Sequence, residues 1–573
     1  MHDLVIRDAK IVDGSGAPAI YGDVAVDNGK IVQVNGEKAA SGKREINANG
    51  ALLTPGWVDV HTHYDGQATW DPYLSPSSWH GVTTAVMGNC GVGFAPVKRH
   101  MREWLIQLME GVEDIPNAAL SEGIDWQWET FPEYMNALEK MPRVMDIGCQ
   151  VPHGALRPYV MGENGVESND ATPDEIDAMR RITREALLAG ALGFSTSRTL
   201  IHKGADGKHV PGTFARLEEV FGIGRALGDA KRGVFQMTSN HVGMDQETVW
   251  MRKLAEETGQ PVAFNVQQID THPELWKTLV AQIEDAGRAG VPLYGAFCGR
   301  PVGLLFSWGG TFHPFIAHPS YQPLRTLSAA DRYKALQDPA VRAKLLAEQP
   351  HGIDDYTKMK AIAFHKMFRL GTGNSTPDYE PDPSGSAAAI AARTGRQPNE
   401  IAYDWMLEDE GRAIIYFPVF NYSYEKLSHT YELLQHPRTM LSLGDGGAHC
   451  GYICDASLPT FMLTHWTRDR TRGEKLPLEL IVKRQTSSTA GIYGLHDRGL
   501  IKPGYLADFN LIDYDNLALH SPHFIADLPA GGRRIVQEAS GYLATIKAGE
   551  TIFEHGQATG AMPGKLIRGP QAL

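Results

Sequence analysis

The chain has 573 residues, of which 42% are hydrophobic and 21% are charged, an ordinary composition for a globular protein. A chain of this length exceeds what one hydrophobic core usually supports, so we expect at least two structural units. The 54 basic and 67 acidic residues give a formal net charge of −13, which disfavours nucleic acid and anionic lipid surfaces as partners.

Membrane and secretory signals are also missing from the sequence. No stretch reaches the roughly 18 consecutive apolar residues of a membrane-spanning helix, and the N-terminal residues lack the basic start and apolar centre of a secretory signal. We therefore expect a cytoplasmic protein with a small-molecule substrate and with neither a membrane nor a nucleic acid as partner.

Both ends of the chain read as short strands. Residues 3–50 alternate apolar and polar positions, with turn-forming Asn-Gly pairs between them. The region from about residue 500 shows the same pattern of short strands separated by glycine-containing turns. We expect residues 1–54 and 499–573 to form one small β-sandwich domain.

The region between the ends alternates apolar β-branched runs with helical segments, which is typical of parallel strands joined by helices. Eight such strands favour a TIM-like (β/α)8 barrel over a doubly wound sheet, and hence an α/β fold, for residues 55–498. The segment 301–397 reads as an elaborated insertion, whose aromatic residues around Phe306, Trp308 and Phe312 either shape the substrate site or pack the loop. The candidate strands are VDVHTH, VTTAVMG, MDIGCQV, ALGFSTS, GVFQMTS, PVAFNVQ, VPLYGAF and TMLSLGD.

His61 and His63 flank Thr62 directly after the apolar run LTPGWVDV. The spacing by itself carries little weight, because 22 histidines in a chain of this length give roughly one such pair by chance. The strand-end position is more informative, since alternation puts both imidazoles on one side and the C-terminal rim of a barrel is where active sites lie. The pair is a candidate metal site, the alternative being two histidines satisfied by local hydrogen bonds.

Several stretches along the chain resemble one known family. They are similar to the D-aminoacylase, or N-acyl-D-amino-acid deacylase, branch of the amidohydrolase superfamily. The resemblance covers nearly the whole chain and is least clear in the central insertion. It rests on PGWVDVHTHYDGQ, WHGVTTAVMGNCGVGFAP, HGALRPYVMG, ALGFSTS, PGTFA, GDGGAH and IKPGYLADFNLID.

The resemblance implies a metal site built from strand ends. Carried over to this chain, its ligands are His61 and His63 after the first strand, Cys90 after the second, His241 after the fifth and Asp445 after the eighth. A thiolate with imidazoles and a carboxylate is typical of zinc. Considered alone, Cys90 would more often be a small buried apolar residue.

The family's histidine after the sixth strand has no counterpart in this chain. Its place falls near Val266 or Gln267, and His272, a few residues on, reads as a solvated loop histidine. The fourth strand, ALGFSTS, also lacks the metal-bridging lysine of other superfamily members. We therefore expect one tight Zn²⁺ site and leave room for a second, weaker one.

Asp445 is the candidate catalytic residue, because a carboxylate beside the metal can act as general base and then as general acid. His449 has the same offset from this aspartate as the substrate-contacting histidine of hydantoinase-like and dihydroorotase-like members. His153, Arg157 and Arg198 follow predicted strands and are candidate substrate-binding residues. A structural role in loop packing is about equally compatible with the sequence for these four residues.

The resemblance implies that a metal-activated water hydrolyses the amide bond of an N-acyl amino acid, with a preference for the D configuration. The arginine that binds the substrate carboxylate in D-aminoacylases is absent from the segment GAHCGYICDASLPTF. One alternative is therefore a cyclic amide or imide hydrolase of the hydantoinase type, which the offset of Asp445 and His449 suggests. A catalytically inactive scaffold is a further alternative, and the sequence leaves a homo-oligomer open.

Overall fold

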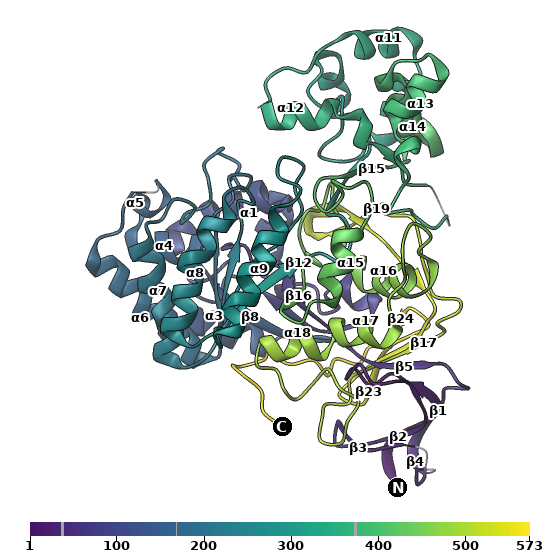
Figure 1. Cartoon of the computed structure of the whole chain (residues 1–573). Helices are drawn as coiled ribbons and strands as arrows, with labels where there is room; N and C mark the ends of the chain where they lie inside the picture. Colours follow the sequence, from purple (N-terminus) through teal and green to yellow (C-terminus); the bar gives the residue numbers. More distant parts are fainter. Residues whose placement is uncertain (36–38, 168, 354, 372–374) are drawn as a thin grey trace.

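The computed structural model describes residues 1–35, 39–167, 169–353, 355–371 and 375–573. A curled sheet of eight parallel strands forms its centre, in the order β16-β12-β11-β10-β9-β8-β7-β6 (Figure 1). Each strand coincides with one of the eight predicted runs, so the α/β fold with a parallel sheet is confirmed. The strands are β6 (Trp57–Thr62), β7 (Val82–Met87), β8 (Asp146–Pro152), β9 (Gly193–Ser197), β10 (Val234–Thr238), β11 (Val262–Asn265), β12 (Leu293–Phe297) and β16 (Thr439–Leu441).

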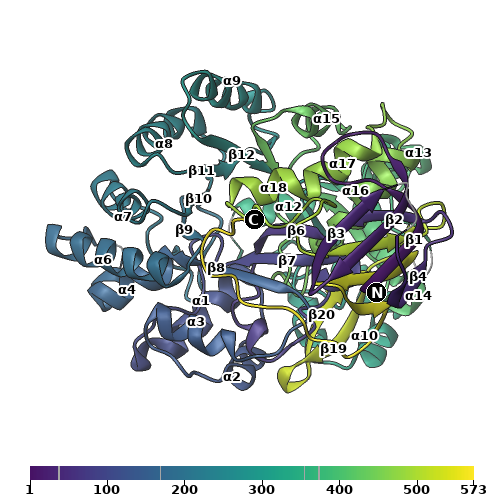
Figure 2. The same cartoon turned by 90° about the horizontal axis from the view of Figure 1, so that it is seen from below.

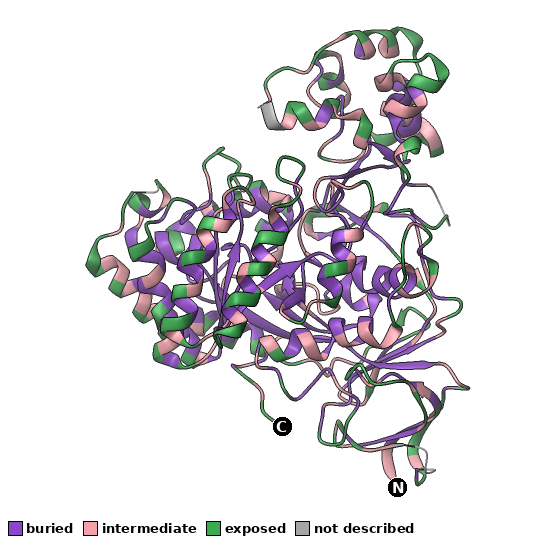
Figure 3. Ribbon diagram, viewed as in Figure 1, coloured by how far each residue is buried: buried purple, intermediate pink, exposed green. Residues whose placement is uncertain are grey.

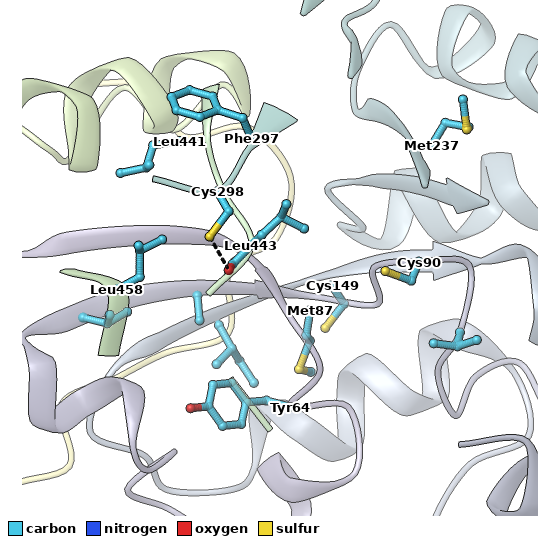
Figure 4. Close-up of a cluster of buried hydrophobic side chains, with 14 of the residues drawn as sticks. Tyr64, Met87, Cys90, Cys149, Met237, Phe297, Cys298, Leu441, Leu443 and Leu458 are labelled. Carbon is cyan, nitrogen blue, oxygen red and sulfur yellow. Dashed lines mark hydrogen bonds between the residues drawn. The ribbon is translucent and has the colours of Figure 1, made fainter. Parts of the chain in front are cut away.

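The two edges of this sheet meet beyond the end of β16. Asp445 N–H donates to His61 O at 3.0 Å, and His63 N–H donates to Gly446 O at 2.8 Å. Figure 4 shows the apolar interior nearby, where Cys298 Sγ–H donates to Leu443 O at 3.9 Å. The segment after β16 therefore contacts both the end of β6, at the far edge of the sheet, and Cys298, the residue that follows β12.

Helices cover the outer face of the sheet (Figure 2), and α6 to α9 pack against one another in chain order. The sequence sets where α6 begins, because Thr172 and Glu175 form a capping box and Pro173 occupies the first turn. No described helix is both long and apolar enough to cross a membrane. The helices of this part are α1 (Arg102–Glu113), α2 (Asn117–Gly123), α3 (Phe131–Glu139), α4 (His153–Met161), α5 (Glu163–Val166), α6 (Pro173–Ala189), α7 (Leu217–Ala230), α8 (Met244–Thr258), α9 (Leu275–Arg288), α15 (Ser428–Gln435), α16 (Leu458–Thr464), α17 (Leu478–Gln485) and α18 (Ser487–Ile492).

Strands from both ends of the chain share one nine-stranded sheet, in which β5 pairs with β1 on one side and with β17 on the other. The recorded pairings make a single sheet, so a two-layered sandwich stays a prediction. The strands are β1 (His2–Ile11), β2 (Ile20–Asp27), β3 (Lys30–Asn35), β4 (Gly42–Asn47), β5 (Leu52–Pro55), β17 (Phe509–Ile512), β22 (Tyr542–Lys547), β23 (Glu550–Glu554) and β24 (Gln557–Ala558).

The chain between β17 and β22 leaves this sheet. Here β18 (Ala518–Leu519) pairs with β21 (Ala539–Ser540), and β19 (His523–Leu528) pairs with β20 (Gly532–Val536). Within β20, Ile535 N–H donates to Cys450 O at 2.7 Å. Part of the predicted C-terminal β segment therefore packs against the loop that follows β16.

The insertion forms a separate lobe, at the top of Figure 1, around the small antiparallel sheet β13-β15-β14. Phe306 and Trp308 are buried in the core of this lobe, and Phe312 packs against it, so their aromatic rings help to hold the lobe together. The ribbon of the lobe contains both buried and exposed segments (Figure 3). The lobe extends past residue 397 to β15. Its elements are β13 (Gly303–Phe306), α10 (Ala329–Leu336), α11 (Pro339–Ala347), α12 (Asp355–Ile362), β14 (Phe368–Arg369), α13 (Ala387–Thr394), α14 (Pro398–Gly411) and β15 (Ile415–Pro418).

Candidate metal centre

The end of β6 presents two imidazoles on one side. His61 lies in β6 and His63 follows its last residue, whereas Thr62 between them points away and donates its hydroxyl proton to Val86 O at 2.9 Å. His61 Nε2 is 3.2 Å from Cys90 Sγ. One ligand atom from each of His61, His63 and Cys90 lies within 4.8 Å of the other two, and all three residues are buried.

A tight loop after β7 places Cys90. The side-chain amide of Asn89 donates to Thr62 O at 3.2 Å and to Val86 O at 2.9 Å, and Cys90 N–H donates to Gln236 Oε1 at 3.2 Å. Cys90 has a φ of 56°, in the left-handed region that L residues rarely adopt. Such strained residues gather at functional sites, where the surrounding contacts enforce them.

Asp445 approaches both histidines from the loop after β16. Its Oδ1 is 3.4 Å from His61 Nε2 and 3.7 Å from His63 Nε2. Asp445 has a φ of 47° and His449 one of 54°. Four of the five predicted metal ligands, namely His61, His63, Cys90 and Asp445, are thus brought together.

His241 lies beside this group rather than in it. Its ring packs 4.6 Å, between centroids, from Phe420, and it lines the same cavity as Cys90. Because β10 ends at Thr238, strand alternation does not set the direction of His241, whose φ is 66°. Its predicted role as a ligand stays a prediction.

Burial controls the ionisation of these groups. It lowers the pKa of His61 well below its ordinary value and that of His63 to about 3, so both imidazoles are neutral and keep a free lone pair. Burial, together with the carboxylates of Glu113 and Asp445, raises the pKa of the Cys90 thiol well above its ordinary value. Burial also raises the pKa of Asp445 to about 6, against the opposing effect of His449.

Sequence reasoning missed Glu113, the last residue of α1. Its side chain is 1% exposed, with Oε1 at 3.4 Å from His63 Nδ1 and Oε2 at 3.5 Å from His449 Nε2. A signal existed in the sequence, because Glu113 lies four residues after Met109 and seven after Ile106, on the apolar face of the helix. A charged residue on such a face indicates either a buried ion pair or a site.

The buried groups fit a divalent metal ion. Both ring nitrogens of His63 and both carboxylate oxygens of Glu113 lack hydrogen-bond partners among the described residues. The recorded ion pairs of Glu113 and Asp445 within the described chain are all with histidines. Two buried carboxyl groups, a thiol and two neutral imidazoles therefore form a donor set that suits a divalent cation, and a thiol with imidazoles favours zinc.

A cavity of about 180 Å³ opens beside His61, Cys90 and Asp445. His449 lines it, and its predicted contact with substrate stays a prediction; His202, which was not predicted, lines it as well. Lys360, on α12 of the insertion, is the one lysine or arginine among the described residues that line the cavity. The apolar part of the wall includes Val302, Leu304, Val419, Phe420 and Ile453.

Gln267, one of the two residues near the expected place of the sixth-strand histidine, also lines the cavity. Gln268 N–H donates to Asn421 Oδ1 at 2.9 Å, and the amide nitrogen of Asn421 donates to Gln267 Oε1. These hydrogen bonds fix the orientation of the Gln267 side-chain amide, because Oε1 must be the atom that accepts from Asn421. Its Nε2 is buried and has no hydrogen-bond partner among the described residues, so a donor is available at the cavity wall.

The remaining candidate substrate-binding residues are engaged elsewhere. His153 Nε2 lies 2.9 Å from Glu219 Oε1, and Arg157 Nε–H donates to the same oxygen at 2.8 Å. Arg198 donates to Ala215 O at 2.8 Å. None of the three is among the described cavity-lining residues, so the geometry gives them structural partners and no contact with the cavity.

Comparisons with known proteins show the family of the chain. A model of the amidohydrolase family matches residues 44–553. The chain is 25% identical over 571 residues to a D-aminoacylase of Alcaligenes xylosoxydans xylosoxydans, with 99% of this chain and 97% of the relative covered.

Two solved structures share the fold. One is a D-aminoacylase described with a binuclear metal centre, one-metal activation and second-metal attenuation; its TM-score is 0.65 at 23% identity, with 99% of this chain and 100% of that chain covered. The other is an N-acyl-D-glutamate deacylase from Bordetella bronchiseptica, complexed with zinc and a phosphonate inhibitor. Its TM-score is 0.64 at 21% identity, with 99% of each chain covered.

Proposed function

Because the chain belongs to the amidohydrolase family, we propose that it hydrolyses the amide bond of an N-acyl-D-amino acid. The observation that carries the proposal is the convergence of His61, His63 and Cys90, with Asp445 beside them, at the wall of one cavity. The relatives named as D-aminoacylase and N-acyl-D-glutamate deacylase support the substrate class.

His61, His63 and Cys90 would hold one tight zinc ion, with Asp445 completing the site. A bound zinc ion lowers the pKa of water towards neutrality and polarises a carbonyl group. A second, weaker site would have to use His241. Its neighbourhood at the sixth strand offers the amide groups of Asn265 and Gln267, which are poor zinc ligands compared with imidazole.

Asp445 moves the proton in the proposed reaction. Its carboxylate accepts the proton of the attacking water and then delivers it to the departing nitrogen, because an amine is a poor leaving group until it is protonated. The backbone bond from Asp445 N–H to His61 O, 3.0 Å long, holds the carboxylate against the metal-binding histidines. No covalent intermediate is needed.

The cavity wall offers a group for each part of an N-acyl amino acid. Lys360 would pair with the substrate carboxylate, in place of the arginine that is absent from the segment after Asp445. The Nε2–H donor of Gln267 and the imidazole of His449 would contact polar atoms near the scissile amide. The apolar wall around Phe420 and Ile453 would accommodate the acyl group or the amino-acid side chain.

The proposal extends to the architecture around this site. We propose that residues 55–498 form a (β/α)8 barrel carrying the insertion, and that residues 1–54 and 499–573 form the small β domain as a sandwich. The backbone bonds between the segment after β16 and the end of β6 support closure of the barrel.

A panel of N-acetyl-D-amino acids and their L enantiomers tests the function. We expect stoichiometric release of acetate and a primary amine, loss of activity in a chelator and recovery with zinc. Absence of amine release across the panel, from protein shown to contain metal, would contradict the proposal. Product mass separates the cyclic amide alternative, which the offset of Asp445 and His449 suggests, because ring opening adds water without fragmentation.

A further inference from the structure

Glu113 is a buried carboxylate that nothing in the protein core explains. It ends α1, where its neighbours on the same helix face are the apolar residues Ile106 and Met109. Its side chain is 1% exposed, and neither carboxylate oxygen has a hydrogen-bond partner among the described residues. An isolated buried carboxylate opposes folding unless a donor or a positive charge compensates for its lost hydration.

The groups that face Glu113 both belong to the candidate site. Oε1 is 3.4 Å from His63 Nδ1, and Oε2 is 3.5 Å from His449 Nε2. In addition, His449 N–H donates to the backbone carbonyl of Glu113. The other ring nitrogen of His63, Nε2, faces Asp445 Oδ1 at 3.7 Å, so Glu113 and Asp445 lie against opposite nitrogens of one imidazole.

The other carboxylates at this end of α1 have ordinary partners. Glu110 accepts a hydrogen bond from the amide of Asn117 at 3.3 Å. Asp114 accepts from Gly451 N–H at 2.7 Å and from the Thr311 hydroxyl at 2.9 Å. Asp114 therefore binds α1 to the loop that contains His449. The side chain of Glu113, by contrast, faces only the imidazoles of His63 and His449 among its recorded ion-pair partners in the described chain.

We propose that Glu113 is a positioning residue of the metal centre, which ties the metal-binding His63 to His449 at the cavity wall. A shift of roughly half an ångström would bring each nitrogen into hydrogen-bond range of its oxygen. The carboxylate then accepts from His63 Nδ1–H, which fixes the tautomer that leaves Nε2 free for the metal. Its second oxygen accepts from His449 Nε2–H and holds that ring beside Asp445. The inference rests on the proposed metal site.

The effect on metal binding has a definite direction. A carboxylate that accepts from the distal N–H of a ligating imidazole makes this ligand more basic and fixes its orientation, and losing such a partner weakens metal binding roughly ten- to a hundredfold. The charge of Glu113 also lies close enough to His63 to attract a divalent cation directly. Replacing the carboxylate by an amide of the same shape removes both effects.

The test compares Glu113→Gln with Glu110→Gln, which removes a carboxylate from the same helix but away from the histidines. Zinc affinity is measured by competition with a chromophoric chelator, and the visible spectrum of the Co²⁺-substituted protein reports the ligand field. We expect Glu113→Gln to bind zinc roughly ten- to a hundredfold more weakly and to change the Co²⁺ spectrum. We expect Glu110→Gln to match the wild type in both measurements, and Glu113→Asp to recover part of the affinity.

The thermal midpoint of the metal-free proteins separates positioning from a purely structural role. Because a buried amide is easier to desolvate than a carboxylate, metal-free Glu113→Gln should be at least as stable as the metal-free wild type. Wild-type zinc affinity and an unchanged Co²⁺ spectrum in Glu113→Gln, with or without a lower midpoint, would overturn the role of Glu113. Failure of the wild type itself to bind zinc would instead overturn the metal site on which the inference rests.

Discussion

Asp445 and His61 are joined through both backbone and side chain: Asp445 N–H donates to His61 O at 3.0 Å, and Asp445 Oδ1 lies 3.4 Å from His61 Nε2. The backbone bond does not depend on the side chain. Asp445→Asn should therefore keep the loop in place and retain zinc, yet lose the proton acceptor. Removing a general base typically lowers turnover by roughly 10²- to 10⁴-fold.

Turnover and zinc content of purified Asp445→Asn, measured on the same preparation, check this prediction. A variant with one zinc per chain and wild-type turnover would exclude Asp445 as the proton carrier. A variant that lost its zinc would instead assign Asp445 a mainly ligating role.

Cys90 is the sulfur ligand of the proposed site, since its Sγ lies 3.2 Å from His61 Nε2. Cys90→Ala should lower zinc affinity by more than roughly a hundredfold, because the loss of a direct ligand costs more than the loss of a supporting residue. Cys149→Ala is the matched control, since Cys149 is also a buried free cysteine but lies outside the ligand group. Equal zinc affinity in the two variants would remove Cys90 from the site.

Lys360 is proposed to recognise the substrate carboxylate from α12 of the insertion. A charge-assisted hydrogen bond contributes about 1.5–3 kcal/mol, so Lys360→Gln should raise KM for N-acyl amino acids about ten- to a hundredfold. Substrates in which the carboxylate is replaced by a neutral amide should be unaffected. Exposed Lys358, on the same helix, supplies the control variant Lys358→Gln.

A KM that rises equally for charged and neutral substrates in Lys360→Gln would assign this residue to packing of the insertion. A KM that does not rise for either class would show that a residue other than Lys360 binds the substrate carboxylate. Only the selective loss agrees with direct recognition.

The parts of the structure that the sequence predicts well are those governed by short-range patterns. β7 and β8 are buried along their whole length, and apolar or β-branched residues make up most of both strands, as expected for buried parallel strands. His61 and His63 were predicted because they lie at the end of an apolar strand, β6, whereas Cys90 was predicted from the family resemblance. Cys90 and His241 each lie three residues past the end of a strand, β7 or β10, where loop geometry takes over from alternation, and only Cys90 lies in the ligand group.

Glu113 and Lys360 show what local patterns cannot provide. Each reaches the cavity region from a helix, α1 or α12, and their approach to the strand ends depends on how those helices pack. His153 and Arg157 show the opposite case, since they follow a strand as predicted but meet a buried partner, Glu219, that lies more than sixty residues later in the chain. For all four residues, contacts between segments that are distant in the sequence determine whether the side chain reaches the site.

Glu380 should make stability depend on pH in the acid range. Burial opposes its ionisation, but hydrogen bonds from His465, Arg470 and the Leu427 N–H outweigh burial and lower its pKa from 4.5 to about 2. Arg470 contributes two bonds, from Nε–H and Nη2–H, each 3.0 Å long. The pKa of this carboxyl is therefore lower in the folded than in the unfolded chain, so its ionised form stabilises the fold.

This stabilisation is complete above the unfolded pKa of 4.5 and is lost as the pH falls through the folded value of about 2. Its size corresponds to roughly 3 kcal/mol. We expect Glu380→Gln to be less stable than the wild type at neutral pH and to flatten the fall in unfolding free energy between about pH 4.5 and 2. Urea unfolding at a series of pH values measures this slope, with exposed Glu474→Gln as the control. A wild-type slope in Glu380→Gln would show that other carboxylates carry the acid sensitivity.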